Sequence, residues 1–140
     1  MIYPEFFPED RENEIDEKKV FEQLKRISDT YDIFYSRKFI TDGIGKKPEY
    51  EVDFIIAIPE KAIICLEVKG GIINYSGTKD EWTQNSRLMS KRPDSQASSA
   101  THALIKGFSG LIGDMAIGWG LCFPDGDLGS KALPTSIDSN

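Results

Sequence analysis

One short apolar segment that ends in two charges constrains this chain more than any other feature. Residues 62–66 read Ala-Ile-Ile-Cys-Leu and continue directly into Glu67, Val68 and Lys69. Because residues i and i+2 of a β-strand point to the same face, Glu67 and Lys69 project together from the end of an apolar strand. Burying such charges costs free energy unless they are paired or bind a metal. The segment therefore predicts either an ion pair at an exposed strand end or a functional site.

A second strand-like segment lies just upstream and carries an acid of its own. Residues 50–58 contain the apolar run Phe-Ile-Ile-Ala-Ile, which follows Asp53 directly. If residues 59–61 form a three-residue hairpin loop, paired residues have numbers that add up to 120, and Asp53 lies opposite Glu67. Directly opposed residues have Cβ atoms roughly 4.5–5.5 Å apart. A loop one residue longer or shorter would break this match.

Both faces of the predicted hairpin are apolar along most of its length. A sheet that is buried on both sides needs helices above and below it. Charge is confined to one end, where the same register places Glu51 opposite Lys69. We therefore predict an α/β fold whose sheet lies between helices, with a site at the charged end of the hairpin.

Helical spacing of apolar residues predicts a first helix over residues 12–31. Glu17 precedes Val20 and Phe21 by three and four positions, so it lies on the buried stripe and not on the solvated face. A carboxylate in that position is a further candidate for the site. A second helix is predicted over residues 95–112, where small residues on one stripe indicate close packing on the sheet: Gln96, Ala100, Ala103 and Gly107.

The remaining segments complete the sheet and its connections. Gly70 and Gly71 end the charged strand and would allow a phosphate backbone to approach closely. Residues 72–75 and a segment at Trp82 are predicted to extend the sheet as a small hairpin. Further strands are expected at residues 33–40 and 116–123, a turn-rich loop at 41–48 and an irregular tail at 126–140.

Length and composition set the broad class of the protein. The 140 residues suffice for one domain, with a core at about residues 12–125, and are too few for two. No apolar stretch approaches membrane-spanning length, and the N-terminus lacks the basic and apolar regions of a signal peptide. Cys65 and Cys122 each lie in an apolar run, which indicates buried thiols in a reducing compartment. We therefore expect a cytoplasmic protein that does not enter a membrane.

The net charge of −6 argues against a protein that coats DNA non-specifically. Ten of the 23 acids lie within residues 1–32, however, so the rest of the chain is nearly neutral. Arg87, Lys91 and Arg92 form a local basic cluster. A local contact with a nucleic acid is therefore compatible with the composition.

The acids and Lys69 fit metal-dependent hydrolysis of a phosphodiester. That reaction needs a hard cation that neutralises the scissile phosphate and acidifies a water, and Mg²⁺ prefers one or two carboxylates together with carbonyl and water oxygens. Asp53, Glu67 and the backbone carbonyl of Val68 would supply such an open ligand set for Mg²⁺ or Mn²⁺. Lys69 would position the attacking water, help to deprotonate it or stabilise the phosphorane, and Glu17 would hold a second cation or orient water.

Other chemistries lack the residues that they need. His102 is the only histidine and lies in a helical segment rich in alanine and serine, which argues against zinc hydrolase and histidine acid–base mechanisms. The sequence has no glycine-rich phosphate loop ending in Lys-Ser or Lys-Thr. Gln96 either starts its helix or faces the site.

Taken in order, these motifs resemble the nuclease-related domain, NERD, of the PD-(D/E)xK nucleases. Asp53, thirteen further residues and then Glu67-Val68-Lys69 are similar to the signature of that superfamily. One departure is Asp16, where the family usually has glycine before the motif glutamate. The likeness covers about residues 16–125 and includes residues 16–24, 31–36, 51–54, 66–71, Trp82, 93–97 and 122–125.

The resemblance implies a restriction-endonuclease-like core, with a mixed sheet flanked by helices, and metal-dependent cleavage of DNA. It also implies a role in DNA processing or repair, together with a helicase or another module in the same chain or in a separate one. The chain is then one piece of a longer protein, and no oligomeric state follows. By position, the resemblance assigns the site to Glu17, Asp53, Glu67, Lys69 and Gln96.

Three functions stay open at this level. The first is a deoxyribonuclease that depends on Mg²⁺ or Mn²⁺. The second is an interaction module of nuclease ancestry, weak or silent as a catalyst, which the acidic balance of the chain favours. The third is a phosphodiesterase that acts on RNA or on nucleotides.

Overall fold

The computed structural model describes residues 1–40 and 49–126. The turn-rich loop expected at residues 41–48 and nearly all of the tail expected at residues 126–140 lie outside this part of the chain. No helix of the described residues is long and apolar enough to cross a membrane.

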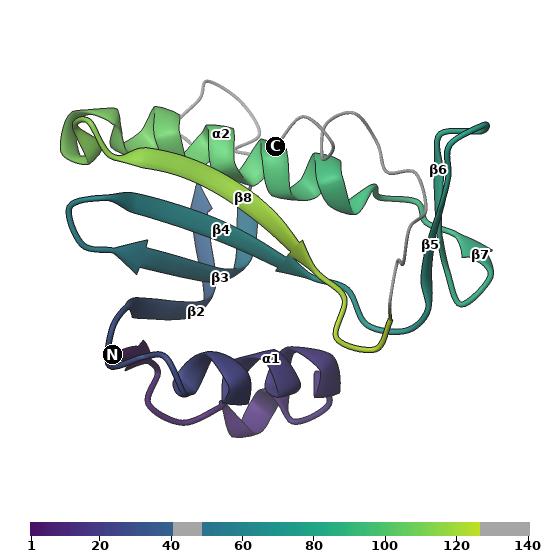
Figure 1. Ribbon diagram of the computed structural model, residues 1–140, viewed down its shortest axis with the longest axis horizontal. Helices are drawn as coiled ribbons and strands as arrows, with labels where there is room; N and C mark the ends of the chain where they lie inside the picture. The colour runs from purple at the N-terminus through teal and green to yellow at the C-terminus, as the bar shows by residue number, and fades with distance from the viewer. Residues whose placement is uncertain (41–48, 127–140) are drawn as a thin grey trace.

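A mixed five-stranded sheet forms the centre of the fold (Figure 1). Its strands are β1 (Ile2–Tyr3), β2 (Asp32–Ile40), β3 (Glu49–Ile58), β4 (Ala62–Val68) and β8 (Ala116–Cys122), in the order β1-β2-β3-β4-β8. The inner pairs β2–β3 and β3–β4 are antiparallel, whereas β1 on β2 and β8 on β4 are parallel. The four longer strands agree with the predicted segments to within about one residue at each end.

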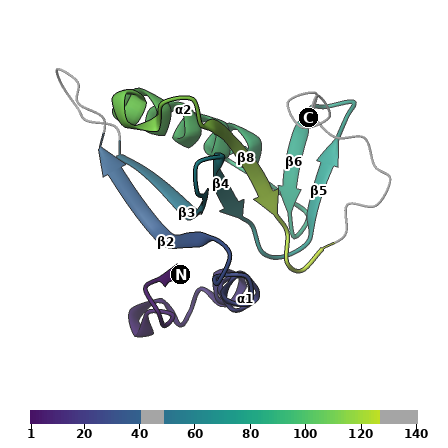
Figure 2. The ribbon, with the colours of Figure 1, turned by 60° about the vertical axis from the view of Figure 1, so that its left-hand side comes forward.

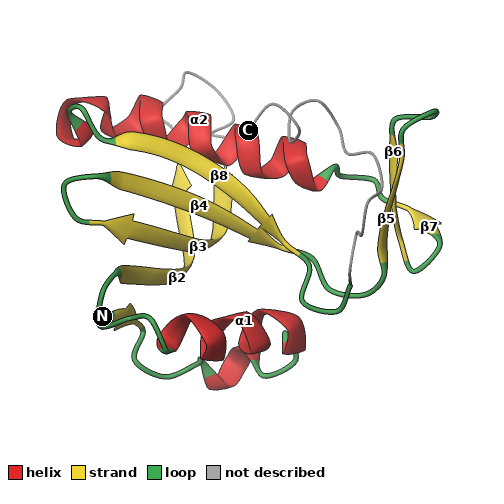
Figure 3. Cartoon of the chain, viewed as in Figure 1, coloured by secondary structure: helices red, strands yellow, loops and turns green. Residues whose placement is uncertain are grey.

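Two helices cover the two faces of this sheet, α1 (Ile15–Lys25) and α2 (Pro93–Ile112). Figure 3 shows them on opposite sides of the strands. Each helix packs against its own apolar cluster, the first containing Phe21, Phe54 and Val68 and the second containing Val52, Cys65, Ala100 and Leu104. The predicted α/β fold, with a sheet between helices, is confirmed.

The first helix is shorter than the predicted span of residues 12–31. It begins at Ile15 and ends at Lys25, and turns follow as far as Thr30. Ser28 Oγ donates to the Lys25 carbonyl at 2.8 Å, and the N-terminal ammonium of Met1 donates to the carbonyl of Ser28. Short polar side chains that bond the nearby backbone compete with helical pairing, so the helix stops before Ser28.

The second helix begins at Pro93, whose fixed φ and missing N–H suit the first helical position. Ala100 and Ala103 are buried, as the small-residue stripe predicts, and Ala97 and Leu104 are buried beside them. Gly107 is exposed, so its assignment to that stripe is wrong. The helix also has a break just after this residue, at Phe108, where φ −124° and ψ 16° leave the helical region.

The small hairpin does not extend the central sheet as predicted. A separate antiparallel sheet is formed by β5 (Ile73–Ser76), β6 (Glu81–Gln84) and β7 (Arg87–Leu88). Gly71, with φ +77°, redirects the chain after β4, and Figure 2 shows β5 and β6 lying beyond β8. Trp82 anchors this second sheet because it is only 1% exposed and contacts the rings of Tyr75 and Phe123.

Gly70 and Gly71 make room for side chains of the protein itself. A Cβ at Gly70 would lie 1.6 Å from Asp16 Oδ2, and a Cβ at Gly71 would lie 2.7 Å from Asn85 Oδ1. Asp125 reaches the same turn, where its Oδ2 accepts the Gly71 amide at 3.0 Å. The two glycines let the first turn of α1 lie against the end of β4. The close approach of a phosphate backbone to this turn stays a prediction.

Substitution of Gly70 by alanine should destabilise the protein by about 1–3 kcal/mol, because the new methyl group displaces Asp16. Denaturant unfolding measures this change. The double variant Gly70→Ala/Asp16→Gly should recover most of the loss, since the three atoms nearest to the added Cβ all belong to the side chain of Asp16.

Gly110→Ala is the matched control, because no atom lies within 4 Å of the added Cβ. Alanine in a helix should leave stability unchanged or raise it slightly. Equal losses for the Gly70 and Gly110 variants would contradict the packing described for Gly70.

Candidate active site

The hairpin of β3 and β4 has the predicted register, and it opens at Asp53. Paired residues run from Ile58 with Ala62 to Phe54 with Leu66, so their numbers add up to 120 as expected. Beyond Phe54 the ladder ends. Asp53 Oδ2 accepts the backbone N–H of Val68 at 2.8 Å, so a side chain replaces the missing backbone partner.

Strand β3 also loses its regular alternation at Asp53. Val52 packs on the α2 side of the sheet whereas Phe54 packs on the α1 side, although the two residues are two positions apart. The ladder between β2 and β3 pairs Tyr35 with Phe54 and then Arg37 with Val52, and it skips Ser36. Ser36 has φ +49°, a conformation uncommon for residues other than glycine. Such outliers persist where the surrounding structure requires them, and they cluster at functional sites.

The opening changes the neighbours of Glu51. The predicted pairing of Glu51 with Lys69 is not formed, because the ladder stops before it. Glu51 Oε1 instead accepts Ser36 Oγ–H at 2.9 Å and forms an ion pair with Arg11 at 3.4 Å. Glu51 therefore belongs to the α1 side of the site.

Glu67 and Lys69 form an ion pair, with 3.1 Å between Glu67 Oε1 and Lys69 Nζ. This pair does not lie at an exposed strand end, because Glu67 is 7% exposed. Burial raises the pKa of Glu67, and the charge of Lys69 opposes that rise. A buried carboxylate paired with a partly buried lysine fits a site better than a surface salt bridge.

Glu17 enters the site from α1, as its position on the buried stripe predicts. Its Oε2 accepts the hydroxyl of Tyr35, a buried residue of β2. Burial raises the pKa of Glu17, whereas the hydrogen bond from Tyr35 lowers it. Tyr35, a residue of the sheet, thus holds the carboxylate of Glu17 in place.

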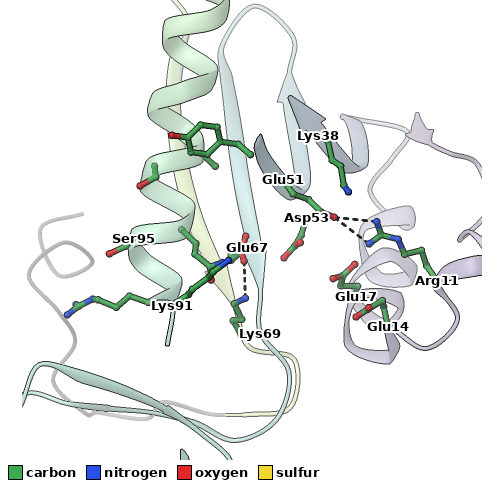
Figure 4. Close-up of a pocket in the computed structure, with 15 residues that line it drawn as sticks. Arg11, Glu14, Glu17, Lys38, Glu51, Asp53, Glu67, Lys69, Lys91 and Ser95 are labelled. Atoms are coloured by element: carbon green, nitrogen blue, oxygen red, sulfur yellow. Dashed lines mark hydrogen bonds and ion pairs between the residues drawn. The ribbon is translucent and has the colours of Figure 1, made fainter. Parts of the chain in front are cut away.

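These side chains line one cleft of about 730 Å³. Figure 4 shows Arg11, Glu14 and Glu17 on the α1 side, Lys91 and Ser95 on the α2 side, and Asp53, Glu67 and Lys69 between them. Among the residues that the structure describes, five acids and five bases line the cleft, namely Glu14, Glu17, Glu51, Asp53, Glu67, Arg11, Lys38, Lys69, Lys91 and Arg92. The site is therefore a mixed charged cleft and not a simple acidic hollow.

Gln96 lies in the same cleft, on the second turn of α2. Its Oε1 is buried and has no hydrogen-bond partner within the described residues. A buried acceptor without a donor costs free energy, and such atoms mark places where a water or a ligand group binds. The structure thus brings together all five residues that the family resemblance assigns to the site.

Asp53 has the most strongly perturbed carboxyl of the cleft. It is 9% exposed, and burial raises its pKa from the usual 3.8 to about 7, with a further contribution from the negative charge of Glu67. A bound cation would reverse this effect, because opposite charge favours the ionised form. Two neighbouring buried carboxylates whose pKa values are both raised are therefore suited to a divalent cation.

The chemistry of the donors fits Mg²⁺ or Mn²⁺. Asp53 and Glu67 offer hard oxygen ligands from two neighbouring strands, and such ions bind through one or two carboxylates plus waters. Within residues 1–40 and 49–126, no three Asp, Glu, His or Cys side chains surround one metal position. Asp53, Glu67, the backbone carbonyl of Val68 and the carboxylate of Glu17 all stay predictions as ligands of a cation.

Several lining residues could not be identified from the sequence pattern. Arg11 lies in a short 3₁₀ turn (Glu9–Arg11) that carries no motif, and Lys38 was part of an ordinary strand. Tyr35 had a signal, because it falls within the resemblance at residues 31–36, but nothing indicated its contact with Glu17. His102 is exposed on α2 and lines no part of this cleft, as expected from its context.

The raised pKa of Asp53 predicts a pH dependence of stability in EDTA. Between about pH 4 and pH 7 the unfolded chain ionises this carboxyl while the folded protein keeps its proton, so stability should fall as pH rises. The loss amounts to at most about 4 kcal/mol. Asp53→Asn should flatten this part of the profile, whereas Asn at the exposed Asp29 should keep the wild-type slope.

Thermal unfolding in EDTA at a series of pH values measures the effect. Mn²⁺ should raise the wild-type Tm more at pH 8 than at pH 5, because it binds the ionised carboxylates. A wild-type profile that is flat, or that matches the Asp53→Asn profile, would show that Asp53 does not titrate as described.

One known family matches most of the chain. The model of the nuclease-related domain, NERD, matches residues 12–117. No curated protein and no solved structure matches the chain. The matched region includes Glu17, Asp53, Glu67, Lys69 and Gln96, and it covers well over half of the chain. The chain belongs to the nuclease-related domain family.

Proposed function

We propose that this chain hydrolyses phosphodiester bonds of DNA with Mg²⁺ or Mn²⁺. One observation carries the proposal: the buried carboxylates of Asp53 and Glu67 lie beside Lys69 in a cleft that Glu17 and Gln96 also line. A purely structural role offers no reason to bury two acids at the point where two strands separate. Membership of the nuclease-related family supports the same chemistry.

Asp53 and Glu67, with the carbonyl of Val68, would hold the cation. When bound, it neutralises charge on the scissile phosphate and lowers the pKa of a coordinated water. The Val68 amide fixes one oxygen of Asp53, which leaves the other oxygen of that carboxylate to face the cleft. A ligand held in this way needs little reorganisation when the cation binds.

Lys69 and Glu17 would act on the water and the phosphate. Lys69 Nζ forms an ion pair with Glu67, so a short movement of the side chain would take it from that pair to a phosphate oxygen or an attacking water. Glu17, whose pKa is raised by burial, is suited to accept a proton from water. Tyr35 keeps Glu17 oriented, and the unpartnered Oε1 of Gln96 would accept a hydrogen bond from water or substrate.

A binding module that does not cut is the second candidate. The net charge of −6 favours it, and so does the equal number of acids and bases among the described residues that line the cleft, because neither feature attracts DNA strongly. It predicts no cleavage with any metal. An RNA or nucleotide phosphodiesterase is distinguished from a deoxyribonuclease by the substrate that is cut.

We further propose a place in DNA processing or repair, beside a helicase or another module. The family is the only support for this role. The sequence itself has no glycine-rich phosphate loop of a nucleotide-driven motor, so such a motor would come from the other module. A cytoplasmic location fits such a role.

Glu67→Gln and Lys69→Met should each reduce cleavage of DNA by roughly 10²-fold or more, because each removes one charge from the reacting centre. Supercoiled plasmid, single-stranded DNA, RNA and a nucleotide diester are incubated with Mg²⁺, Mn²⁺ or EDTA. Wild-type activity on DNA should disappear in EDTA.

Lys106→Met is the matched control, because Lys106 is exposed on α2 and lines neither the cleft nor its rim. It should retain wild-type cleavage. Full cleavage by the Glu67 and Lys69 variants, or metal-independent cleavage by the wild type, would overturn the proposed function.

A further inference from the structure

A second cleft adjoins the first and differs from it in charge. It measures about 610 Å³ and shares Lys69, Lys91 and Gln96 with the cleft that contains the carboxylates. No Asp or Glu is among the described residues that line it, whereas Lys69, Arg87 and Lys91 all are. We call it the basic cleft.

The basic cleft lies between α2 and the second sheet, whose strands stand beside the start of that helix in Figure 1. Its wall is the hairpin of β6 and β7. Asn85 and Ser86 form the two-residue turn of this hairpin, with φ +51° and +65°, as a type I′ turn requires. The tight turn brings Arg87 back beside Gln84, on the rim of the cleft.

Hydrogen bonds fix this hairpin to the loop that follows Lys69. The Asn85 amide donates to the Ile72 carbonyl, and Asn85 Oδ1 accepts the Ile72 amide, both at 2.9 Å. Gln84 Nε2 donates to the Gly70 carbonyl at 2.8 Å. The wall that carries Arg87 is therefore held in a defined position relative to Lys69.

Two of the cations are uncommitted within the described residues. Arg92 is held by Asp80 at 2.9 Å and Asp94 at 3.0 Å, so its charge is already neutralised. Arg87 and Lys91 are exposed, and neither has an ion pair or side-chain hydrogen bond among the residues that the structure describes. Both charges are available for an anionic ligand.

We propose that the basic cleft binds the phosphodiester backbone of the DNA strand next to the bond that is cut. This inference rests on the proposed function, and it adds the path of the substrate. Lysine and arginine contribute most of the affinity for phosphates, and amide and hydroxyl groups of Gln, Asn and Ser add hydrogen bonds. The cleft offers both kinds of group and continues into the carboxylate site through Lys69 and Gln96.

The charge distribution explains how an acidic chain would hold DNA here. A cleft lined by one sign of charge concentrates the local potential, whatever the net charge of the molecule. The acids of the neighbouring cleft would repel DNA until a cation neutralises them, so Arg87 and Lys91 supply the local attraction. The strand would thus be held on one side of the catalytic carboxylates.

The test is the salt dependence of DNA binding by the full chain, measured in EDTA so that no cleavage occurs. The probe is a short fluorescein-labelled single-stranded oligodeoxynucleotide, and fluorescence anisotropy is recorded between about 50 and 200 mM salt. Arg87→Gln/Lys91→Gln should bind roughly tenfold more weakly at the lower salt, and the slope of log K against log salt should fall by about 1.4.

Two further variants control for charge and for fold. Lys61→Gln/Lys106→Gln removes the same charge from the opposite end of the sheet and from the exposed side of α2, and it should keep the wild-type slope. Arg87→Lys should also keep it, because the charge is retained. Thermal unfolding should show that all variants stay folded, since every substituted residue is exposed.

Equal losses of DNA affinity in both double variants would overturn the inference. An unchanged slope in Arg87→Gln/Lys91→Gln would overturn it too, as would a wild type that does not bind the probe. Failure of the proposed function would give a different set of results. In that case no DNA is cut with any metal, while the cleft variant still lowers the slope of binding.

Discussion

The hydrogen bond from the Val68 amide to the carboxylate of Asp53 is the interaction on which the rest of the site depends. It forms where the β3–β4 ladder ends, so the backbone of β4 keeps a partner although the strands separate. A buried amide left without an acceptor would cost free energy, and the carboxylate prevents that cost. The separation of two paired strands thereby becomes a stable cleft whose walls carry Asp53 and Glu67.

The second constraint is the position of α1. Asp16 fills the space above Gly70, and Lys19 joins it to Asp125 through ion pairs of 3.7 and 2.7 Å. These contacts hold the first turn of the helix against the end of β4. Glu17 follows Asp16 in the chain and is therefore carried into the cleft, where Tyr35 binds it. The aspartate that stands in place of the usual family glycine serves here as a packing residue.

Much of this site could be predicted from the sequence because it depends on local periodicity. The three-residue loop fixed the register that sets Asp53 against Glu67, and helical spacing identified Glu17. The separate second sheet could not be predicted, because it depends on the positive φ of Gly71. The changed neighbours of Glu51 depend on the unusual conformation of Ser36, which no pattern of apolar residues indicates.

We propose above all that Asp53 and Glu67 are ligands of one divalent cation. A crystal of the wild-type protein soaked in Mn²⁺ tests it directly, through the anomalous scattering of the metal. We expect one strong peak in the carboxylate cleft, in contact with Asp53 and Glu67, and no peak there in Glu67→Gln. A metal bound instead at the surface carboxylates of Asp16 and Asp125, or an empty cleft in the wild type, would contradict it.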